Sequence, residues 1–137
     1  MELSKSYLTE LIYQVNGAAI EVHQEMGPGL LESVYHKFMK YELQLRGISF
    51  ESELWVPMYY KGVEVNSNLR CDLFVEGVLP VELKAVEMIL GIHKMQLMTY
   101  MKLLNAPIGL LINFNVTNIF YNGQKTMVNE LYRSLPE

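Results

Sequence analysis

The sequence predicts one α/β domain in which a mixed β-sheet is flanked by helices. Segments with apolar residues at helical spacing alternate with segments rich in aromatic and β-branched residues. The order of helix, helix, three strands, helix, two strands and helix predicts a meander followed by a crossover, outside the doubly wound class. The 137 residues, of which 50% are apolar, suffice for a single core.

Two helices are predicted at the start of the chain. Residues 7–26 carry apolar side chains at the helical period, and the Gly-Pro-Gly at 27–29 ends this segment. Residues 31–45 repeat the same spacing, and Arg46-Gly47 supplies a basic last turn followed by a C′ glycine. We therefore expect two amphipathic helices.

The middle of the chain predicts three antiparallel strands in succession. Residues 48–60 alternate and are rich in strand formers, although Pro57 indicates an edge, a bulge or a break. Lys61-Gly62 predicts a turn, and residues 63–75 predict the next strand. The third strand follows a turn near residues 76–77, which completes the meander.

The last third of the chain predicts one long helix, two strands and a terminal helix. A helix is expected over residues 89–105, where methionines are typical core filler. Residues 108–114 form a continuous apolar run, which favours a strand covered on both faces. A short strand is expected at 116–121, then a turn at Asn122-Gly123, and a helix at 127–135.

Composition excludes several classes of protein. No apolar run approaches the roughly 20 residues of a membrane helix, and the first residues lack the pattern of a signal peptide. The single cysteine, Cys71, permits no internal disulfide and no cysteine zinc cluster. We therefore expect a cytoplasmic protein. The net charge of −4 argues against strong non-specific binding to nucleic acid but is compatible with a local basic rim or a bound metal.

The stretch from residue 69 to 86 contains the charged residues that most need an explanation. Asp72, the only aspartate of the chain, lies on the first strand of a hairpin, and Glu82 and Lys84 lie on the second. Alternation puts Glu82 and Lys84 on one face of that strand. Such charges are costly to bury without partners. They form either a buried ion-pair cluster or a functional site, and their retention favours the site.

The turn of this hairpin decides whether Asp72 joins the same face. A two-residue turn would need a positive φ at Glu76 and would send the two carboxylates to opposite faces. A three-residue loop at 75–77, with its glycine left-handed, fits the residues better and pairs Asp72 with Pro80. Asp72 and Glu82 would then be diagonal neighbours with Cβ atoms about 7–8 Å apart. At that spacing, they could hold one divalent cation.

Other polar residues have ordinary structural explanations beside functional ones. His23 lies at the edge of an apolar helix face, where a histidine commonly bonds to a carbonyl. Glu32, which the helical spacing places beside Tyr35 on the helix surface, complements the helix dipole in the first turn. Gln96 and Tyr100 are four residues apart, as expected for a surface pair on one helix.

Four sequence blocks, in order, carry a resemblance to a known family. They are Gly29-Leu30-Leu31-Glu32-Ser33-Val34-Tyr35, VELKAVE at 81–87, Gln96-x-x-x-Tyr100 and GLLINFN at 109–115. Together with Asp72 they span about residues 23–115 and resemble the bacterial GxxExxY protein family of the PD-(D/E)XK nuclease superfamily. The resemblance implies a restriction-endonuclease-like sandwich over residues 1–137. The chain departs from the superfamily pattern at Cys71, where a proline often precedes the motif aspartate.

The resemblance also implies a site that hydrolyses phosphodiester bonds of DNA or RNA with Mg²⁺ or Mn²⁺. Asp72 and Glu82 would be the main metal ligands, with the main-chain carbonyl of Leu83. Glu32 would add a water-mediated or second-metal ligand. Lys84 would orient the attacking water and stabilise developing charge.

Supporting roles are implied for four further residues. Gln96 would position Lys84 or the phosphate, Tyr35 and Tyr100 would support the site, and His23 would be an outer contributor. The alternative is a non-catalytic module that keeps the fold and binds nucleic acid or a partner protein, which the acidic net charge favours. The sequence leaves a homodimer open in either case.

Overall fold

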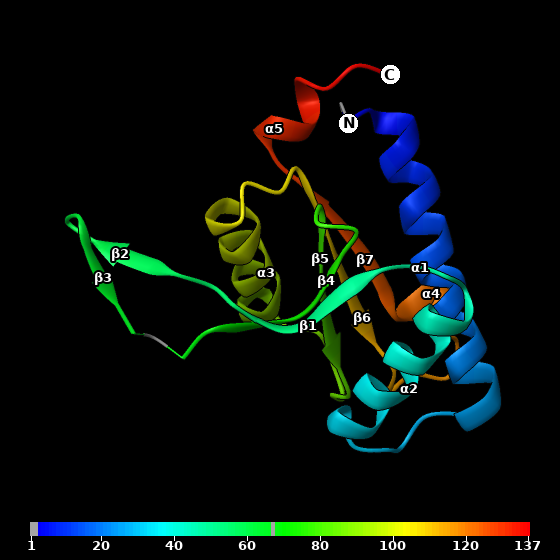
Figure 1. Cartoon of the computed structure of the whole chain (residues 1–137). Helices are drawn as coiled ribbons and strands as arrows, with labels where there is room; N and C mark the ends of the chain where they lie inside the picture. Colours follow the sequence, from blue (N-terminus) through cyan, green and yellow to red (C-terminus); the bar gives the residue numbers. More distant parts are fainter. Residues whose placement is uncertain (1–2, 67) are drawn as a thin grey trace.

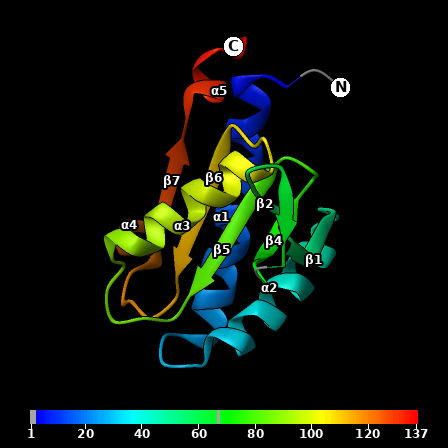
Figure 2. The ribbon, with the colours of Figure 1, turned by 90° about the vertical axis from the view of Figure 1, so that its left-hand side faces the viewer.

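The computed structural model describes residues 3–66 and 68–137. Its helices are α1 (Lys5–Met26), α2 (Glu32–Leu45), α3 (Gly91–Leu103), α4 (Ile119–Asn122) and α5 (Glu130–Arg133). Its strands are β1 (Phe50–Trp55), β2 (Met58–Tyr60), β3 (Val63–Val65), β4 (Arg70–Val75), β5 (Leu79–Lys84), β6 (Ile108–Asn113) and β7 (Gln124–Val128). The main sheet lies between α1 and α2 on one side and α3 on the other (Figure 1), an arrangement also visible in Figure 2.

The main sheet is mixed, as the sequence predicts. Its strand order is β1-β4-β5-β6-β7. β5 and β6 run parallel and are joined by the crossover helix α3, whereas the other neighbouring strands run antiparallel. β6 is buried along its whole length and β5 along all but its last residue, as expected for central strands covered on both faces. The predicted sandwich, with a mixed sheet flanked by helices, is therefore confirmed.

The three long helices also agree with the sequence pattern. α1, α2 and α3 fall within or close to the ranges predicted from apolar spacing. The side chain of Ser4 caps α1 by accepting a hydrogen bond from the Tyr7 N–H, and Gly47 follows α2 at a φ of +70°. None of the helices in the described ranges has the length and apolar character needed to cross a membrane.

The hydrophobic core lies mainly between the sheet and the α1–α2 layer. Fully buried members on the helical side include Leu8, Val15, Tyr35, Met39 and Leu43, and those on the sheet include Leu73, Val81, Leu83, Leu110 and Ile112. A smaller cluster on the opposite face joins α3 to β6 through Leu97, Met101, Ala106 and Leu111. Apolar packing on both faces of the sheet holds the central strands in place. These strands position the charged residues of the β4–β5 hairpin.

The prediction of one strand over residues 63–75 is wrong, and the strand predicted at 48–60 is interrupted. β2 and β3 form a separate two-stranded sheet, while β1 and β4 pair directly in the main sheet. Pro57 ends β1, because proline cannot donate a ladder hydrogen bond. The Val56 N–H donates to the Leu69 carbonyl at 3.0 Å, which closes the base of the inserted ribbon.

The C-terminal elements also differ from the prediction. Residues 116–121 form no strand, and the Asn118 side chain caps α4 by accepting a hydrogen bond from the Tyr121 N–H. The edge strand is β7, and the terminal helix shortens to the single turn α5. Asn122-Gly123 therefore ends a helix instead of linking two strands. The signal in the sequence for this helix was Asn118, because asparagine is a favoured N-cap residue.

Candidate metal centre

The β4–β5 hairpin brings Asp72 and Glu82 opposite each other. The strands are in register with Leu73 across from Val81. The same register places Asp72 across from Glu82, whereas the sequence predicted a diagonal relation and a pairing of Asp72 with Pro80. The hairpin therefore brings the two carboxylates together, in a direct relation across the strands instead of the predicted diagonal one.

The turn of the hairpin takes a conformation that the sequence argues against. The connection comprises residues 76–78, one residue later than predicted, and Glu76 has a φ of +54°. Ser49 holds Glu76 there, since the Glu76 N–H donates to the Ser49 carbonyl at 2.9 Å and the Ser49 N–H donates to Glu76 Oε1 at 3.1 Å. A left-handed residue with a side chain costs roughly 1–2 kcal/mol, which two such hydrogen bonds offset.

The two carboxylates replace ladder hydrogen bonds between β4 and β5. The Asp72 N–H donates to Glu82 Oε1 at 3.1 Å, and the Leu83 N–H donates to Asp72 Oδ2 at 2.8 Å. One oxygen of each carboxylate is thereby fixed by the backbone of the opposite strand. The other oxygens, Asp72 Oδ1 and Glu82 Oε2, take no part in these two backbone hydrogen bonds. These two oxygens are the donors that a cation would use.

Negative charge is concentrated at this point of the sheet. Glu82 is only 3% exposed. Burial, followed by the charge of the Asp72 carboxylate, raises the pKa of Glu82 to about 8, although the hydrogen bond from the Asp72 N–H and the charge of Lys84 lower it in part. Burial and the fields of Glu82, Cys71 and Asp72 raise the pKa of the nearby Tyr100 hydroxyl to about 12. The site therefore favours a positively charged ligand.

Lys84 is half-buried at the end of β5. Among the described residues it forms no ion pair closer than 4.0 Å with Asp72 or Glu82. Within the described ranges, ion pairs closer than 4.0 Å join Lys5 to Glu137, Arg46 to Glu42 and Arg133 to Glu130. None of these pairs includes a residue of the β4–β5 hairpin. This arrangement argues against a buried ion-pair cluster as the reason for the three charges.

Glu32 begins α2 and contributes a third carboxylate to the same electrostatic environment. The side chain is exposed, so the effect of burial, which is the largest influence raising the pKa of Glu32, is moderated by solvent. Lys84 lowers this pKa, Asp72 raises it, and His36 and His93 lower it. The influence of Lys84 and Asp72 on the pKa of Glu32 indicates that the first turn of α2 faces the hairpin.

Tyr35 supports the loop that precedes Glu32. Its hydroxyl donates to the Gly27 carbonyl at 2.6 Å and accepts from the Leu30 N–H at 3.2 Å. Its ring is fully buried and stacks on Phe114 with centroids 4.5 Å apart. The expectation that Tyr35 lies beside Glu32 on the helix surface is therefore wrong, because the aromatic ring turns into the core.

Substitution of Tyr35 by phenylalanine tests this supporting contact. We expect Tyr35→Phe to lower the free energy of unfolding by about 1–3 kcal/mol, because the Gly27 carbonyl and the Leu30 N–H lose a buried partner while the ring stacking is kept. Chemical denaturation measures the change. Tyr13→Phe is the matched control, since Tyr13 is 72% exposed, and an equal effect of the two variants would contradict the assignment.

On the opposite side of the site, α3 presents Gln96 and Tyr100. Gln96 Nε2 donates to the Tyr100 hydroxyl oxygen at 3.2 Å. Tyr100 is buried against Val56 and Cys71, so it ties α3 to the start of β4. His23 lies elsewhere, with Nε2 donating to the Val116 carbonyl at 2.8 Å, as expected for a core-edge histidine.

A comparison with protein families decides the relationship of the chain. The family model described as the PD-(D/E)XK nuclease superfamily matches residues 9–126. The chain belongs to the PD-(D/E)XK nuclease superfamily. No curated protein and no solved structure gave a significant match. Nucleases of this superfamily generally use divalent metals, and their substrates are nucleic acids.

The donor set of this PD-(D/E)XK domain fits a hard divalent cation. Within residues 3–66 and 68–137, no group of three or more His, Cys, Asp or Glu side chains is placed to hold a metal ion. Two carboxylates, each with one oxygen outside the backbone hydrogen bonds, are instead suited to Mg²⁺, which keeps several waters and also binds substrate phosphate. Asp72 and Glu82 would hold the ion, and Glu32 would contribute through water.

Three residues near the site are not among the site residues that the sequence predicted. His36 is four residues after Glu32, a spacing that could have revealed it, and His93 lies on the first turn of α3. Asn113 is 2% exposed and binds both the Val86 N–H (3.0 Å) and the Val86 carbonyl (2.9 Å). A polar residue inside the apolar run of β6 was the signal for Asn113, which fixes the chain just beyond Lys84.

The raised pKa of Glu82 makes stability depend on pH in the metal-free protein. Between the ordinary glutamate value of 4.5 and about 8, the folded chain binds more protons than the unfolded chain. Stability should therefore fall as pH rises through this window, by about 1.4 kcal/mol per pH unit at most. Urea denaturation in EDTA measures the slope. Millimolar Mg²⁺ should reduce it, and a flat profile in EDTA would contradict the assignment.

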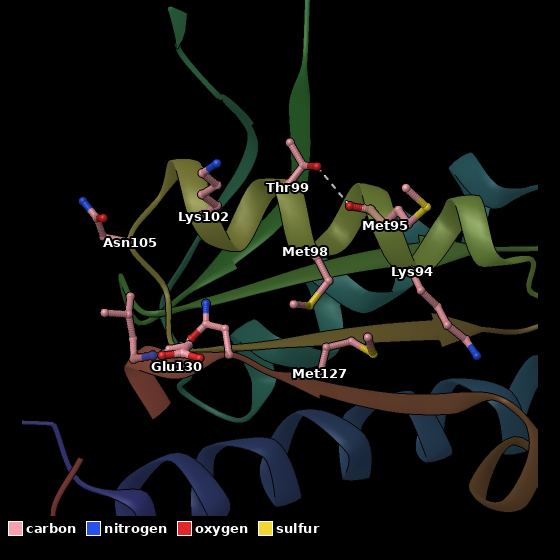
Figure 3. Close-up of a pocket in the computed structure, with 10 residues that line it drawn as sticks. Lys94, Met95, Met98, Thr99, Lys102, Asn105, Met127 and Glu130 are labelled. Atoms are coloured by element: carbon pink, nitrogen blue, oxygen red, sulfur yellow. Dashed lines mark hydrogen bonds between the residues drawn. The ribbon is translucent and has the colours of Figure 1, made fainter. Parts of the chain in front are cut away.

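A groove of about 650 Å³ lies apart from these residues, between α3, β7 and α5. Figure 3 shows Met98 on α3 extending toward the strand that carries Met127, with Lys94 and Lys102 along the helix. Its only acidic lining residue among those described is Glu130. The groove contains none of the predicted site residues and lacks the paired carboxylates that metal-dependent hydrolysis requires.

Proposed function

We propose that this chain is a Mg²⁺- or Mn²⁺-dependent nuclease that hydrolyses phosphodiester bonds of DNA or RNA. The observation that carries the proposal is the meeting of two carboxylates in the interrupted ladder between β4 and β5. Asp72 and Glu82 are held there by backbone hydrogen bonds, although the charge that they concentrate destabilises the sheet. A bound cation would turn this unfavourable arrangement into a favourable one.

Each residue at the site has a distinct part in the proposed reaction. A divalent cation supplies neutralisation of phosphate charge and a lower pKa for the attacking water. Asp72 and Glu82 bind that cation, together with the main-chain carbonyl of Leu83. Lys84, which is free of a close ion pair, orients the water and stabilises the charge that develops on the phosphate. Glu32 holds a water at the cation from the α2 side.

The second helix of the α1–α2 layer and the crossover helix supply positioning groups. Gln96 orients Lys84 or the phosphate, and its hydrogen bond to Tyr100 limits its rotamers. Tyr35 fixes the loop before Glu32. His23 contributes only at a distance, through its hydrogen bond to the Val116 carbonyl.

We further assign the chain to the GxxExxY family within the superfamily. The motif residues have separate physical reasons to occur together. Gly29 has a φ of +99°, which favours glycine. Glu32 begins the helix that faces the hairpin. Tyr35 holds the loop before this helix through hydrogen bonds to the Gly27 carbonyl and the Leu30 N–H.

A cleavage assay tests the proposed function. The purified chain is incubated with labelled single- and double-stranded DNA and RNA in Mg²⁺, in Mn²⁺ and in EDTA. We expect cleavage of at least one substrate in metal and none in EDTA. If no substrate is cleaved in either metal while nucleic acid is still bound, the chain is the non-catalytic binding module and the proposed function is wrong.

A further inference from the structure

The β2–β3 ribbon projects from the body of the protein on the α3 side of the sheet (Figure 1). Among the described residues its strands pair with each other and with no other strand, and the turn between them has Lys61 at a φ of +50° and Gly62 at +81°. We call residues 55–66 and 68–70 the arm. An isolated two-stranded hairpin is at best marginally stable in water. A ribbon of this kind is therefore better explained by binding than by the stability of the fold.

Large apolar side chains line the arm and are open to solvent. Trp55 is 49% exposed, Tyr59 62% and Tyr60 68%, and Val63 and Val65 are exposed as well. Single exposed apolar residues are ordinary, but a contiguous group of them marks a binding surface.

The charges of the arm differ in sign from those of the whole chain. Residues 55–70 contain two basic residues, Lys61 and Arg70, and one acidic residue, Glu64. The whole chain, by contrast, has a net charge of −4. The Arg70 guanidinium lies 4.2 Å from the centre of the Trp55 ring, and Lys61 Nζ lies 5.5 Å from that of Tyr60. Cations interleaved with aromatic rings are typical of surfaces that bind unpaired nucleic acid.

A recess at the base of the arm has the size of a small-ligand pocket. Its volume is about 490 Å³, and its walls are Trp55, Val56, Pro57, Glu64, Val65 and Asn66. Pockets for small organic groups commonly measure about 300–1,000 Å³. One aromatic wall with an amide and a carboxylate nearby suits a planar base, which stacks on its face and hydrogen-bonds at its edge.

The arm is connected to the candidate metal centre in two ways, by the continuous backbone of β4 and by side-chain packing. Arg70 begins β4 two residues before Asp72, a distance of about 7 Å along a strand. Val56 at the base of the arm packs with Cys71 and with Tyr100 of α3. A strand of nucleic acid bound on the arm would therefore lead to the two carboxylates.

We propose that the arm binds nucleic acid through unpaired bases, with one base in the recess against Trp55 and phosphates beside Lys61 and Arg70. This inference rests on the proposed nuclease function and names its substrate class as single strands, or duplexes with unpaired ends or loops. Charge favours nucleic acid over a second copy of the chain. In a symmetric dimer, the two arms would bring like charges together.

Trp55 is the only tryptophan of the chain, so its fluorescence reports on the recess directly. The full chain is titrated in EDTA, where metal-dependent cleavage cannot proceed, with a short single-stranded thymidine oligonucleotide and with a blunt duplex of equal length. We expect saturable quenching by the single strand and a Kd at least about tenfold weaker for the duplex, which offers no unpaired base for stacking.

Two variants and one control locate the contact. Tyr60→Ala should weaken single-strand binding about tenfold through lost stacking, and Lys61→Gln should reduce the salt dependence of binding by roughly one phosphate contact. Tyr121→Ala is the matched control, since Tyr121 lies on α4, outside the arm, and is 76% exposed. It should bind like the parent chain.

Three results would overturn the inference. They are no saturable quenching by the single strand, equal effects of Tyr60→Ala and Tyr121→Ala, and a blue shift of Trp55 emission with protein concentration alone. The last result, with a dimer in sedimentation, would make the arm a subunit interface. Quenching without cleavage in Mg²⁺ or Mn²⁺ would contradict the proposed nuclease function alone, and cleavage without quenching would contradict the arm alone.

Discussion

Lys84→Met is expected to lower the cleavage rate by about 10²-fold or more while the fold is retained. The methionine keeps most of the aliphatic stem and removes the charge that acts mainly in the transition state. Stability should change little, because the ammonium is half-buried and forms no close ion pair whose loss would leave a buried carboxylate without its partner. Cation binding by Asp72 and Glu82 should persist and can strengthen, since a neighbouring positive charge is lost. Single-turnover cleavage and urea denaturation of the same preparation measure both effects.

The matched control is Lys102→Met, which makes the same change at an exposed position of α3. This variant should cleave at the parental rate. A structural role for Lys84 would give a different pattern. Loss of one partner from a buried ion-pair cluster costs roughly 3–5 kcal/mol, so a Lys84→Met chain destabilised by that amount would contradict the catalytic assignment.

Glu82→Gln is expected to stabilise the metal-free protein and to abolish cleavage. The amide is close in shape to the carboxylate and can still accept a hydrogen bond from the Asp72 N–H, while its NH₂ group can donate to the Asp72 carboxylate. Replacing repulsion by a hydrogen bond should raise the free energy of unfolding by about 1–3 kcal/mol at pH 8 in EDTA. Denaturation at pH 5 and pH 8 measures the gain, which should be smaller at pH 5, where Glu82 is already protonated.

The control for this substitution is Glu25→Gln on an exposed position near the end of α1. Its stability in EDTA should show the same pH profile as the parent chain. If Glu82→Gln destabilises the metal-free protein at pH 8, the Glu82 carboxylate stabilises the fold. That result would contradict the claim that repulsion between Asp72 and Glu82 destabilises the protein in the absence of a cation.

Much of the fold could be predicted because the periodicity of the apolar residues is strong. The α1 helix, the buried strand β6 and the crossover α3 each depend on a pattern that extends over many residues. The failures are at short elements, where a local cap or contact decides the outcome. Asn118 caps α4 where a strand was predicted, and Pro57 diverts the chain into a ribbon that periodicity alone does not distinguish from a continuous strand.

The candidate site could be predicted in its residues but not in its register. Asp72, Glu82 and Lys84 were identifiable because charges inside apolar strands are costly. The turn was misjudged because the hydrogen bonds that hold Glu76 at a positive φ come from Ser49, which is distant in sequence. The displaced ladder hydrogen bonds, and the approach of His36 and His93 to Glu32, likewise depend on tertiary contacts.

Calorimetric titration of Mn²⁺ into the parent chain and into Glu82→Gln shows whether Asp72 and Glu82 hold a cation. The measurement needs no substrate and is independent of catalysis. If Asp72 and Glu82 hold the cation, the parent chain should bind one Mn²⁺ with release of protons at pH 7, because the raised pKa of Glu82 leaves this carboxyl partly protonated. Glu82→Gln should show no such binding. Equal binding by the two proteins, or none by the parent chain at millimolar Mn²⁺, would contradict the account.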